Sequence, residues 1–476
     1  MFALNEIIQA VTGIEIKSHD RVFPGASVDS RQPGDGALFI AVPGENTDGH
    51  KFIASAFANG YRAALIQEDV SGDYGFIDLR EGAEKIESDL GAAGNKPLCI
   101  RVDDTIGTLQ KTAAFHRSRL PEMKVIGITG TVGKTSTKEL TYDLLSGVFR
   151  TLKTQGNMNN EIGLPLTLLH AEPDTERAIL EMGFYVPGEI DQLCQIAKPS
   201  VGVVTNVGMV HASRAGSMEV IAQGKSELVR ALPGEGVAIL NYDDPFVRPM
   251  AELTDAKVLY YGSDEHAELS ACNIRSMGMD GVRFELVYHG EHHPVHLPLV
   301  GRHSVMTALR AAAVGLVYDL SWDQITRGLE SGRNQLRMRL TRTKADGVLI
   351  DDTYNASPES TTAALDLLSE MKGRKIAVLG EMRELGQYEK KGHTMVGQKA
   401  AAVCDELIAV GPVTKIMADA AAAAGMDPAH VNWFETTAAA AAFLLDAGYG
   451  KDDVILIKGS RGMMMEKIVE KLEAEA

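Results

Sequence analysis

The stretch Thr129-Gly130-Thr131-Val132-Gly133-Lys134-Thr135-Ser136 follows a short β-branched run, residues 125–129, and leads into a segment of helical character, residues 136–147. A glycine-rich loop between a strand and a helix is typical of phosphate binding. Glycine lets backbone N–H groups approach phosphate oxygens, and the helix N-terminus favours an anion. In such a loop Lys134 reaches the β- and γ-phosphates of a nucleotide, and Thr135 binds Mg²⁺. The order strand, loop, helix therefore predicts a P-loop.

The loop departs from the full Walker A pattern at one position. Six residues before Lys134, where that pattern has glycine, this chain has Ile128, so the loop has the shorter GxxGKT form. The sequence has no Asn-Lys-x-Asp motif of the kind that reads the base in small GTPases, and Thr205-Asn206-Val207-Gly208 is a poor substitute. The loop alone predicts nucleotide phosphate binding without naming a reaction. Its expected ATP contacts are Gly130, Thr131, Val132, Gly133, Lys134, Thr135 and Ser136.

Length and composition indicate a large globular protein. The chain has 476 residues, 45% of them apolar and 23% charged, which suggests three domains of ~150 residues each. Its formal net charge of −17 argues against a nucleic-acid binder, since a phosphate backbone needs a basic surface. The four cysteines show no CxxC spacing, which argues against a zinc site and fits a reducing compartment. Without a signal peptide or an apolar run of ~20 residues, we expect a cytoplasmic protein with no membrane span.

The order of the predicted elements divides the chain into three α/β regions. Residues 1–98 predict a small α/β domain, residues 99–318 a P-loop domain with a mostly parallel, doubly wound sheet, and residues 319–476 a second, Rossmann-like sheet. Strands are expected at residues 37–42, 63–67, 125–129, 178–182, 201–206, 237–241, 347–351, 375–379, 406–410 and 454–457. Helices are expected at residues 51–59, 105–120, 136–147 and 305–317. Residues 81–94 predict a polar connection, and residues 286–299 alternate like an antiparallel pair.

Further polar motifs occur in all three regions. They are, in chain order, Asp29-Ser30-Arg31, residues 44–52, residues 157–165, Glu181-Met182-Gly183, residues 205–208 followed by His211, Lys225, Gly301-Arg302-His303, residues 351–358, residues 379–386 and Lys458-Gly459-Ser460-Arg461. In this order they resemble the motifs of the Mur ligase family, which builds the peptide stem of bacterial peptidoglycan. The resemblance extends over essentially the whole chain.

The resemblance implies a three-domain ligase. Residues 1–98 would bind a UDP-sugar-peptide, residues 99–318 would bind ATP, and residues 319–476 would close over the nucleotide. Among the members of the family, the chain most resembles the one that joins D-alanyl-D-alanine to UDP-N-acetylmuramoyl-tripeptide. In the family, ATP phosphorylates the terminal carboxylate of the substrate, and an amine attacks the acyl phosphate to give an amide, ADP and phosphate. Two anions meet in the first step, so metal ions and cationic groups must offset their repulsion.

By the same resemblance, a small set of residues binds metal and performs the chemistry. Mg²⁺ is expected at Thr135 and Glu181, and a second metal ion at His211 and Lys225. Lys225 is expected to be carbamylated by CO₂, a reaction that needs the neutral amine and converts a cation into an anionic ligand. Without the resemblance, Glu181 is a surface carboxylate at a strand end, and Lys225 is a solvated lysine. The expected catalytic residues are Lys134, His211, Lys225 and Arg339.

The remaining expected contacts are also implied by the resemblance. Beyond the loop, the expected ATP contacts are Asn160, His303, Arg339, Asp352, Tyr354 and Asn355. The expected contacts to the UDP-peptide substrate are Ser30, Arg31, Asp48, Gly49, His50, Asn157 and Asn159. These residue types also have structural interpretations, since asparagine favours turns, aspartate and serine cap helices, and an aspartate can pair with an arginine within one loop.

Three positions depart from the family pattern. Ser304 and Thr307 replace asparagines that the family usually has on the adenine side of the site, and Met338 replaces a glycine before Arg339. The stretch Glu-His-His-Pro-Val-His at residues 291–296 resembles a metal cluster by composition. It lies in an alternating segment outside the motifs, so it predicts a surface hairpin.

Three other functions remain as alternatives. The sister ligase that adds a diamino acid usually has an Asp-Asn-Pro-Arg motif, which this sequence lacks. Folylpolyglutamate synthetase shares the central domain but not the motifs of residues 1–98. A catalytically inactive scaffold gains support only from Ser304 and Thr307, because the residues expected to perform the chemistry are present. We expect ATP and Mg²⁺ as cofactors, the UDP-peptide and D-alanyl-D-alanine as partners, and a monomer.

Overall fold

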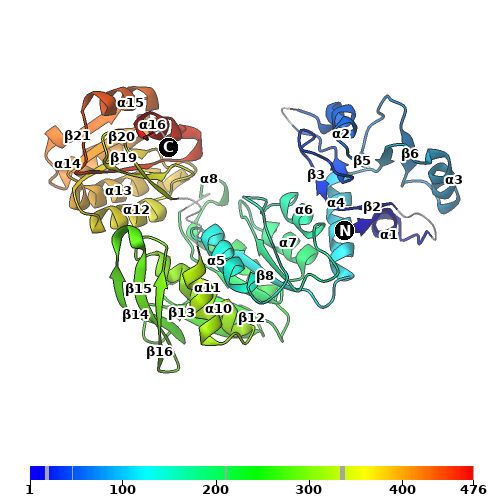
Figure 1. Ribbon diagram of the computed structural model, residues 1–476, viewed down its shortest axis with the longest axis horizontal. Coiled ribbons are helices and arrows are strands. Elements are labelled where there is room, and N and C mark those ends of the chain that lie inside the picture. Colours follow the sequence, from blue (N-terminus) through cyan, green and yellow to red (C-terminus); the bar gives the residue numbers. More distant parts are fainter. Residues whose placement is uncertain (17–20, 45–46, 210–211, 333–337, 475–476) are drawn as a thin grey trace. The chain divides into compact units, whose positions relative to one another are not determined.

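The computed structural model describes residues 1–476 except 17–20, 45–46, 210–211, 333–337 and 475–476 (Figure 1). The described chain divides into two compact units. The first comprises Met1–Gly127, Phe149–Gly183 and Gly188–Val201, and the second comprises Ile128–Val148, Phe184–Pro187 and Gly202–Ala476. Among the described residues, no helix has the length and apolar character needed to cross a membrane.

The first unit contains a five-stranded parallel sheet built from the beginning of the chain. Its strand order is β3 (Ala26–Ser27), β4 (Leu38–Ile40), β5 (Ala63–Ile66), β7 (Leu98–Arg101) and β6 (Gly75–Asp78). All residues of β4 and β5 are buried, as is typical of parallel strands covered on both faces. The prediction that residues 81–94 form a connection was wrong. Ala83–Ala93 forms helix α3 and buries Ile86, Leu90 and Ala93, which recur at helical spacing.

The first unit also contains the predicted metal ligand Glu181 and the strands around it, except Ile128 and Thr129 at the end of one of them. Strands β8 (Lys124–Thr129), β10 (Arg177–Glu181) and β9 (Thr151–Lys153) are neighbours in that order, and β10 and β9 are parallel. Helix α4 (Thr105–Ser118) packs against α1 (Leu4–Thr12), α6 (Gly163–Leu168) and α7 (Glu189–Ala197). Strand β10 ends at Glu181, so this side chain lies at the carboxyl end of the strand, where open α/β sheets bind their ligands.

In the second unit, one run of strands changes from parallel to antiparallel along its length. The order is β11 (Val201–Val204), β12 (Val237–Asn241), β13 (Lys257–Gly262), β14 (Leu269–Ser276), β15 (Val282–Tyr288) and β16 (Glu291–Leu297). Strands β12, β13 and β14 pair in parallel, and β14, β15 and β16 pair antiparallel. The antiparallel pair predicted for residues 286–299 and the hairpin predicted for residues 291–296 are thus confirmed. Helices α5 (Lys134–Ser146), α10 (Ser304–Val317) and α11 (Trp322–Ser331) pack together, and α11 also packs on β16.

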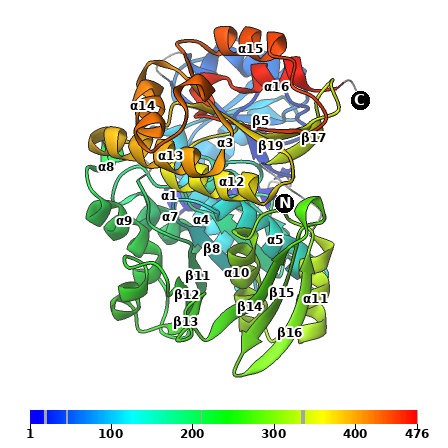
Figure 2. The ribbon, with the colours of Figure 1, turned by 90° about the vertical axis from the view of Figure 1, so that its left-hand side faces the viewer.

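The C-terminal part of the second unit is a six-stranded sheet between two layers of helices (Figure 2). The order is β17 (Arg339–Arg342), β18 (Val348–Asp352), β22 (Asp453–Lys458), β19 (Arg374–Gly380), β20 (Glu406–Val410) and β21 (Val431–Phe434), and only β17 runs antiparallel to its neighbour. Successive residues of each strand point to opposite faces of the sheet and so belong to two separate hydrophobic cores. Ile350 and Ala377 pack with α12 (Pro358–Glu370), α13 (Glu389–Val403) and α14 (Lys415–Ala423). Leu349 and Ile376 pack with α15 (Thr437–Asp446) and α16 (Glu466–Leu472) on the opposite face. This confirms the predicted Rossmann-like sheet.

Candidate nucleotide and ligase site

The predicted P-loop lies between β8 and α5, in the order that the sequence predicts. Gly130 and Gly133 have φ angles of +141° and +89°, a backbone conformation that residues with a side chain rarely adopt. A Cβ atom on Gly130 would lie 1.8 Å from Oγ1 of Thr205, and one on Gly133 would lie 2.5 Å from a guanidinium nitrogen of Arg310. The loop therefore needs glycine at both positions, for backbone conformation and for space.

Asn206 holds the middle of the loop from the end of β11. Its Oδ1 accepts a hydrogen bond from the backbone N–H of Val132 at 2.9 Å, and its Nδ2 donates to the carbonyl oxygen of Val132 at 3.1 Å. The backbone N–H of Thr131 donates to the carbonyl oxygen of Asn206 at 3.0 Å. Asn206 thus fixes three successive peptide groups of the loop through its side chain and its own carbonyl oxygen.

The neighbours of Asn206 extend this support. Thr205 donates its hydroxyl to the carbonyl oxygen of Val132 at 2.7 Å, and Gly208 donates its backbone N–H to Oγ1 of Thr131 at 2.8 Å. The backbone N–H of Met209 donates to Oε1 of Glu359 on α12 at 2.9 Å. The sequence marked residues 205–208 as a poor base-reading motif and as part of the family resemblance, but not as a support for the loop. The signal for this role is a polar Thr-Asn pair directly after a buried strand.

Lys134 is folded onto its own loop. Its Nζ donates to the carbonyl oxygen of Gly130 at 2.7 Å and to that of Thr131 at 3.3 Å. These contacts keep the ammonium beside the backbone amides that the P-loop pattern assigns to phosphate. Thr135, the predicted Mg²⁺ ligand in the next position, is 8% exposed, whereas Ser136 is partly exposed.

Arg310 is a buried cation that the sequence analysis did not identify. It lies on α10, donates from Nη1 to Oγ1 of Thr137 on α5 at 2.9 Å, and donates from Nε to the carbonyl oxygen of Met306 at 2.8 Å. Its guanidinium carbon is 5.7 Å from the ring centroid of Tyr261. Burial lowers the pKa of Arg310, and Tyr261 partly opposes that shift. An arginine within the apolar helix predicted at residues 305–317 was the available signal.

Lys225 is enclosed on the helix α9 (Met218–Arg230) and is 3% exposed. Its Nζ is 5.1 Å from the ring centroid of Phe184. Gly224 makes this approach possible, since a Cβ at that position would lie 1.9 Å from Cε2 of Phe184. Burial and then the positive charge of Lys134 hold the pKa of Lys225 well below its ordinary value. The structure thus favours the neutral amine, and the solvated-lysine alternative is wrong.

Glu181 in the first unit is fully buried and hydrogen-bonded, so it is not a surface carboxylate. Its Oε1 accepts from Nδ2 of Asn159 at 2.9 Å, and its backbone N–H donates to Oγ1 of Thr154 at 3.0 Å. Oδ1 of Asn160 accepts from the backbone N–H of Gly163 at 2.9 Å, at the start of α6. Asn157 and Asn160 are exposed. The asparagine cluster therefore combines carboxylate orientation by Asn159 with a turn role for Asn160.

The predicted substrate residues at the start of the chain lie on a loop that Asp29 organises. Arg31 donates from Nε and Nη2 to the two oxygens of Asp29 at 2.8 and 2.9 Å, while its side chain stays 86% exposed. Hydrogen bonds from the side chain and the backbone N–H of Arg31 lower the pKa of Asp29 to about 2. Ser30 is buried, and its carbonyl oxygen accepts from Asn59 at 2.6 Å. The arginine is thereby presented to solvent in a fixed orientation.

His50 is locked in place by both ring nitrogens. Its Nε2 accepts from the backbone N–H of Gln67 at 2.9 Å, so Nδ1 carries the proton and donates to Oδ1 of Asp48 at 2.6 Å. The backbone N–H of His50 also donates to Asp48 at 3.0 Å. Adding a Cβ to Gly49 would bring it within 2.6 Å of the backbone nitrogen of Val42. Residues 48–50 thus form a fixed turn, and their predicted contact with substrate stays a prediction.

In the C-terminal sheet, the last residues of the neighbouring strands β18 and β22 form a buried ion pair. Nζ of Lys458 lies 2.6 Å from Oδ2 of Asp352 and donates to the carbonyl oxygen of Asn355 at 2.8 Å. The side chains of Tyr354 and Asn355 are exposed. Arg339, at the edge strand β17, pairs with Glu473 at 2.8 Å and with Asp351 at 3.5 Å and is 56% exposed. Arg339, Tyr354 and Asn355 are therefore accessible to a ligand from solvent.

The residues near the start of α10 include two of the departures from the family pattern. Ser304 is buried, and its hydroxyl donates to the carbonyl oxygen of Gly301 at 2.7 Å. Thr307 is also buried, whereas His303 is exposed at the N-cap position of the helix. Ser304 therefore closes the turn that presents His303. The predicted ligand His211 lies outside the described residues.

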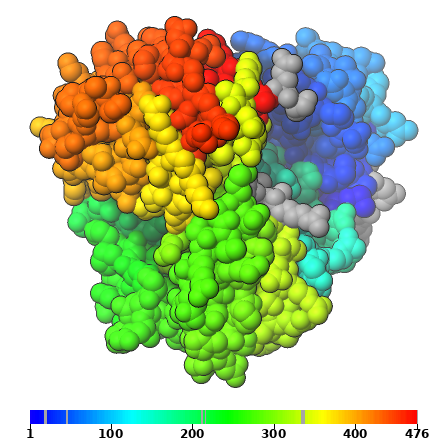
Figure 3. Space-filling model, turned by 60° about the vertical axis from the view of Figure 1, so that its left-hand side comes forward, coloured from blue at the N-terminus to red at the C-terminus, as the bar shows by residue number. Residues whose placement is uncertain are grey.

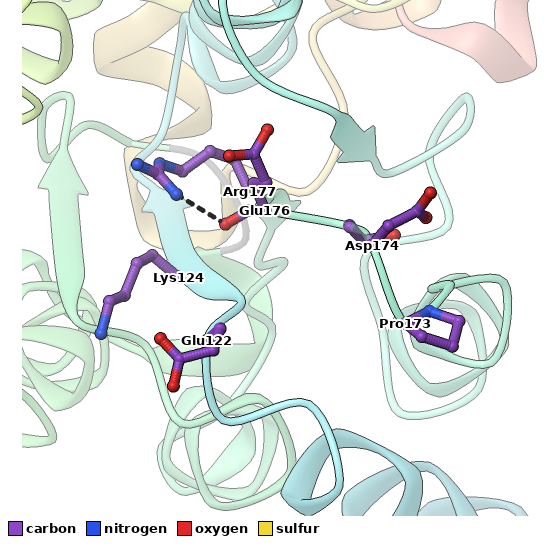
Figure 4. A pocket seen from close by; sticks show the side chains of 7 residues that line it. Glu122, Lys124, Pro173, Asp174, Glu176 and Arg177 are labelled. Atoms are coloured by element: carbon purple, nitrogen blue, oxygen red, sulfur yellow. Dashed lines mark hydrogen bonds between the residues drawn. The ribbon is translucent and has the colours of Figure 1, made fainter.

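A separate pocket in the first unit is lined by residues of both charges (Figure 4). Lys124 and Arg177, the first residues of β8 and β10, lie on its wall, and Nη1 of Arg177 donates to the carbonyl oxygen of Glu176 at 2.9 Å. Ligands of open α/β sheets bind at the carboxyl ends of strands. This pocket lies where two strands begin and contains none of the predicted site residues, so it is not the nucleotide site.

Three family descriptions match successive parts of the chain. Residues 24–87 match "Mur ligase family, catalytic domain", residues 128–315 match "Mur ligase middle domain", and residues 336–461 match "Mur ligase, glutamate ligase domain". Together they span most of the first region, the P-loop region and the C-terminal sheet.

Curated relatives match along nearly their whole length. The UDP-N-acetylmuramoyl-tripeptide--D-alanyl-D-alanine ligase of Mycobacterium tuberculosis is 36% identical, with 96% of this chain and 94% of that protein covered. The protein of the same name from Bacillus subtilis is 34% identical, with 95% and 93% covered. The one from Escherichia coli is 31% identical, with 99% and 98% covered.

Solved structures give the same result. MurF from Acinetobacter baumannii superposes with a TM-score of 0.84 at 29% identity, covering 99% of this chain and 98% of that chain. MurF ligase from Thermotoga maritima in complex with ADP has a TM-score of 0.77 at 27% identity, covering 95% and 98%. The α/β architecture described above is therefore the one found in these ligases.

Proposed function

This chain belongs to the Mur ligase family, and we propose that it is the ATP-dependent ligase that joins D-alanyl-D-alanine to UDP-N-acetylmuramoyl-tripeptide, with release of ADP and phosphate. The observation that carries the proposal is the near full-length match to ligases of that name, on both sequence and structure. The inactive scaffold explains this match less well, because the P-loop and the buried Lys225 are both intact. The sister ligase for a diamino acid explains it less well, because this sequence lacks the Asp-Asn-Pro-Arg motif.

The reaction has two chemical steps. An oxygen of the substrate's terminal carboxylate attacks the γ-phosphorus of ATP, the bond to the β,γ-bridging oxygen breaks, and ADP leaves. The amine of D-alanyl-D-alanine then attacks the acyl carbon, loses a proton, and expels phosphate to leave an amide. The first step brings two anions together, and in the second step negative charge develops on the acyl oxygen as the amine adds. A site that performs both steps must therefore supply positive charge and hydrogen-bond donors in fixed positions.

The loop supplies both kinds of group. The hydrogen bonds from Asn206 hold the peptide groups of Val132 before ATP arrives, so the binding conformation need not be formed at that moment. Lys134 is within reach of the same amides and would transfer its hydrogen bonds from loop carbonyls to phosphate oxygens. Arg310 stabilises the first turn of α5 through its hydrogen bond to Oγ1 of Thr137. These contacts support the proposed ATP-binding role of residues 130–136.

Mg²⁺ suits the oxygen donors among the proposed metal ligands. The hydroxyl of Thr135 and the carboxylate of Glu181 are hard donors of the kind that Mg²⁺ prefers, and Asn159 already orients the Glu181 carboxylate. When bound, Mg²⁺ would neutralise charge on the phosphates. His211 and Lys225 complete the proposed set.

A carbamate on Lys225 is the proposed modification. The lone pair of Nζ attacks the carbon of CO₂, an N–C bond forms, and one amine proton leaves to water, which gives an N-linked carboxylate. Only the neutral amine has that lone pair, and the lowered pKa of Lys225 favours it. An anion at this point would also attract the ammonium of Lys134, whose charge disfavours a protonated Lys225.

The other proposed assignments follow the family. We assign substrate binding to residues 1–98, ATP binding to residues 99–318, and closure over the nucleotide to residues 319–476. The exposed Arg31, fixed by Asp29, supports an anion-binding role in the first of these. Arg339, Asp352, Tyr354, Asn355 and His303 are proposed ATP contacts. We also propose a cytoplasmic monomer.

The test measures phosphate release from ATP and Mg²⁺ in the presence of UDP-N-acetylmuramoyl-tripeptide. Release is expected with D-alanyl-D-alanine as the acceptor and not with a free diamino acid. Release only with the diamino acid and the shorter UDP-dipeptide would assign the chain to the sister activity. No release with any acceptor, from protein that still binds ADP, would instead favour the scaffold.

A further inference from the structure

The antiparallel strands of the second unit carry a side-chain cluster that the ligase reaction does not use. Cys272 lies on β14, Glu285 on β15 and His292 on β16, and one potential ligand atom of each lies within 4.8 Å of the others. Sγ of Cys272 is 3.7 Å from Oε2 of Glu285 and 3.7 Å from Nδ1 of His292. Nδ1 of His292 and Oε2 of Glu285 are 2.8 Å apart.

Strand register explains why these three side chains meet. Cys272 is directly opposite Glu285, and His292 is opposite Val287, two residues along β15 from Glu285. Every second residue of a strand, and the residues directly opposite on paired strands, share one face, so all three project from the same side of the sheet. The other side carries the buried core residues of β15, namely Val282, Phe284 and Leu286. Strands β14 to β16, in the green part of Figure 3, therefore carry the cluster on the face opposite these core residues.

A bulge in β14 adds to the local geometry. The register shifts between Cys272 and Arg275, and Asn273 adopts a left-handed φ of +54°. Bulges re-aim neighbouring side chains and are maintained where such an orientation is needed. Here the bulge follows directly after the cysteine of the cluster.

We propose that Cys272, Glu285 and His292 form a binding site for a divalent transition cation of the zinc class. Zinc binds cysteine sulfur at about 2.3 Å, histidine nitrogen at about 2.0–2.1 Å and carboxylate oxygen at about 2.0–2.2 Å. In a tetrahedron with these bond lengths, sulfur lies about 3.5 Å from nitrogen or oxygen, and nitrogen lies about 3.3 Å from oxygen. The two observed sulfur distances of 3.7 Å nearly match.

The remaining distance also fits once a cation enters. The 2.8 Å separation of His292 and Glu285 is that of a hydrogen bond, and it widens by about half an ångström when a cation replaces the shared proton. The side chains of Glu285 and His292 are 34% and 53% exposed, so a cation can reach them from solvent. Arg275 and Arg283 face each other further along β14 and β15, and both are exposed, so solvent screens their charge.

The ligand types determine the class of cation. A thiolate and an imidazole bind zinc-like ions and suit Mg²⁺ and Ca²⁺ poorly, because those ions prefer oxygen. The site would therefore be independent of the Mg²⁺ that ligation needs. Three protein ligands leave a fourth position for water, and binding releases the thiol proton.

The cysteine spacing could not reveal this site. The expectation of no zinc site rested on local CxxC spacing, whereas these ligands come from three strands and meet only through strand pairing. The second such cluster, Asp48, His50 and Glu68, differs in one respect. Both ring nitrogens of His50 are already engaged in hydrogen bonds, so a cation there would have to displace one of them.

The test is a Co²⁺ titration of the full chain in Mg²⁺-containing buffer without added thiols. We expect the ligand-field bands of tetrahedral Co²⁺ together with a thiolate-to-cobalt charge-transfer band, and Zn²⁺ should displace both. Cys272→Ser should abolish the charge-transfer band, and His292→Ala should weaken Co²⁺ binding by at least about tenfold. Glu285→Gln keeps the side-chain shape and should weaken binding as well.

Two matched variants serve as controls. Cys404→Ser alters a buried cysteine elsewhere, and His266→Ala removes an exposed histidine that pairs with Asp264, so neither should change the spectrum. The proposal is overturned if the native chain gives no charge-transfer band, or if the band persists with the same affinity in Cys272→Ser. Circular dichroism of each variant establishes that a lost band does not reflect unfolding.

Discussion

Replacing Asn206 with alanine tests whether the P-loop is held in its binding conformation before nucleotide arrives. The Asn206 side chain makes two hydrogen bonds to the backbone of Val132, at 2.9 and 3.1 Å. Both are lost in Asn206→Ala. The substitution leaves the residues of the loop itself unchanged. The free loop is then no longer fixed, and nucleotide binding must restore its conformation.

The size of the effect follows from the number of contacts. A hydrogen bond contributes about 0.5–1.5 kcal/mol, so the loss of two costs about 1–3 kcal/mol. A cost of about 2 kcal/mol weakens binding about 30-fold, since each 1.4 kcal/mol is a factor of ten. Isothermal titration calorimetry with ADP and Mg²⁺ should measure this increase in the dissociation constant.

Asn432→Ala is the matched control for this experiment. Asn432 lies on β21 and donates from Nδ2 to Oε1 of Glu406 at 3.0 Å, outside the loop. It should lower the melting temperature to a comparable extent and leave the ADP affinity unchanged. An ADP affinity for Asn206→Ala within about twofold of the native value would show that the hydrogen bonds stabilise the fold without preparing the loop.

Four further predictions concern lysines. Lys134→Ala should abolish ligation in the phosphate-release assay while circular dichroism stays native, and near-normal turnover would remove the P-loop assignment. Lys225→Ala should lower activity and regain part of it with a short-chain carboxylate; full activity without the carboxylate would contradict the carbamate. Burial lowers the pKa of Lys225 in the folded protein below its value of about 10.4 in the unfolded chain. At a pH between these two pKa values the unfolded chain binds more protons than the folded one, so the free energy of unfolding rises with pH. Lys225→Met in CO₂-free buffer should therefore raise stability at neutral pH and flatten this rise in urea unfolding; an unchanged slope would argue against a neutral lysine. Lys458→Met leaves Asp352 buried without its lysine and should lower the free energy of unfolding by about 3–5 kcal/mol; a loss below about 1 kcal/mol would argue that the pair is not structural.

Local pattern was sufficient for most of the fold. The glycine loop, the buried strand runs and the alternating segment at residues 286–299 each report a short-range geometry, and all were confirmed. Residues 81–94 were misread because charged residues concealed the spacing of Ile86, Leu90 and Ala93. Helical periodicity carries that information, whereas average polarity does not.

The site was harder to predict where contacts join distant parts of the sequence. Asn206 acts on Val132, and Arg310 acts on Thr137, so their roles depend on how strands and helices pack. Neither residue type reveals its partner by spacing. The family motifs identified Lys225 as a special position, but only the structure supplies the physical reason, which is its burial beside Phe184.

The resting position of Lys134 has a consequence for turnover. Since its ammonium already donates to the carbonyl oxygens of Gly130 and Thr131, an arriving phosphate gains only the difference between two sets of acceptors. That difference grows as negative charge develops on the transferring group, because the carbonyl oxygens stay neutral. When phosphate departs, the same carbonyls accept the ammonium again. Under the proposed role of Lys134, the loop would therefore hold its product less tightly than the charge of a lysine alone suggests, which would favour rapid release for the next cycle.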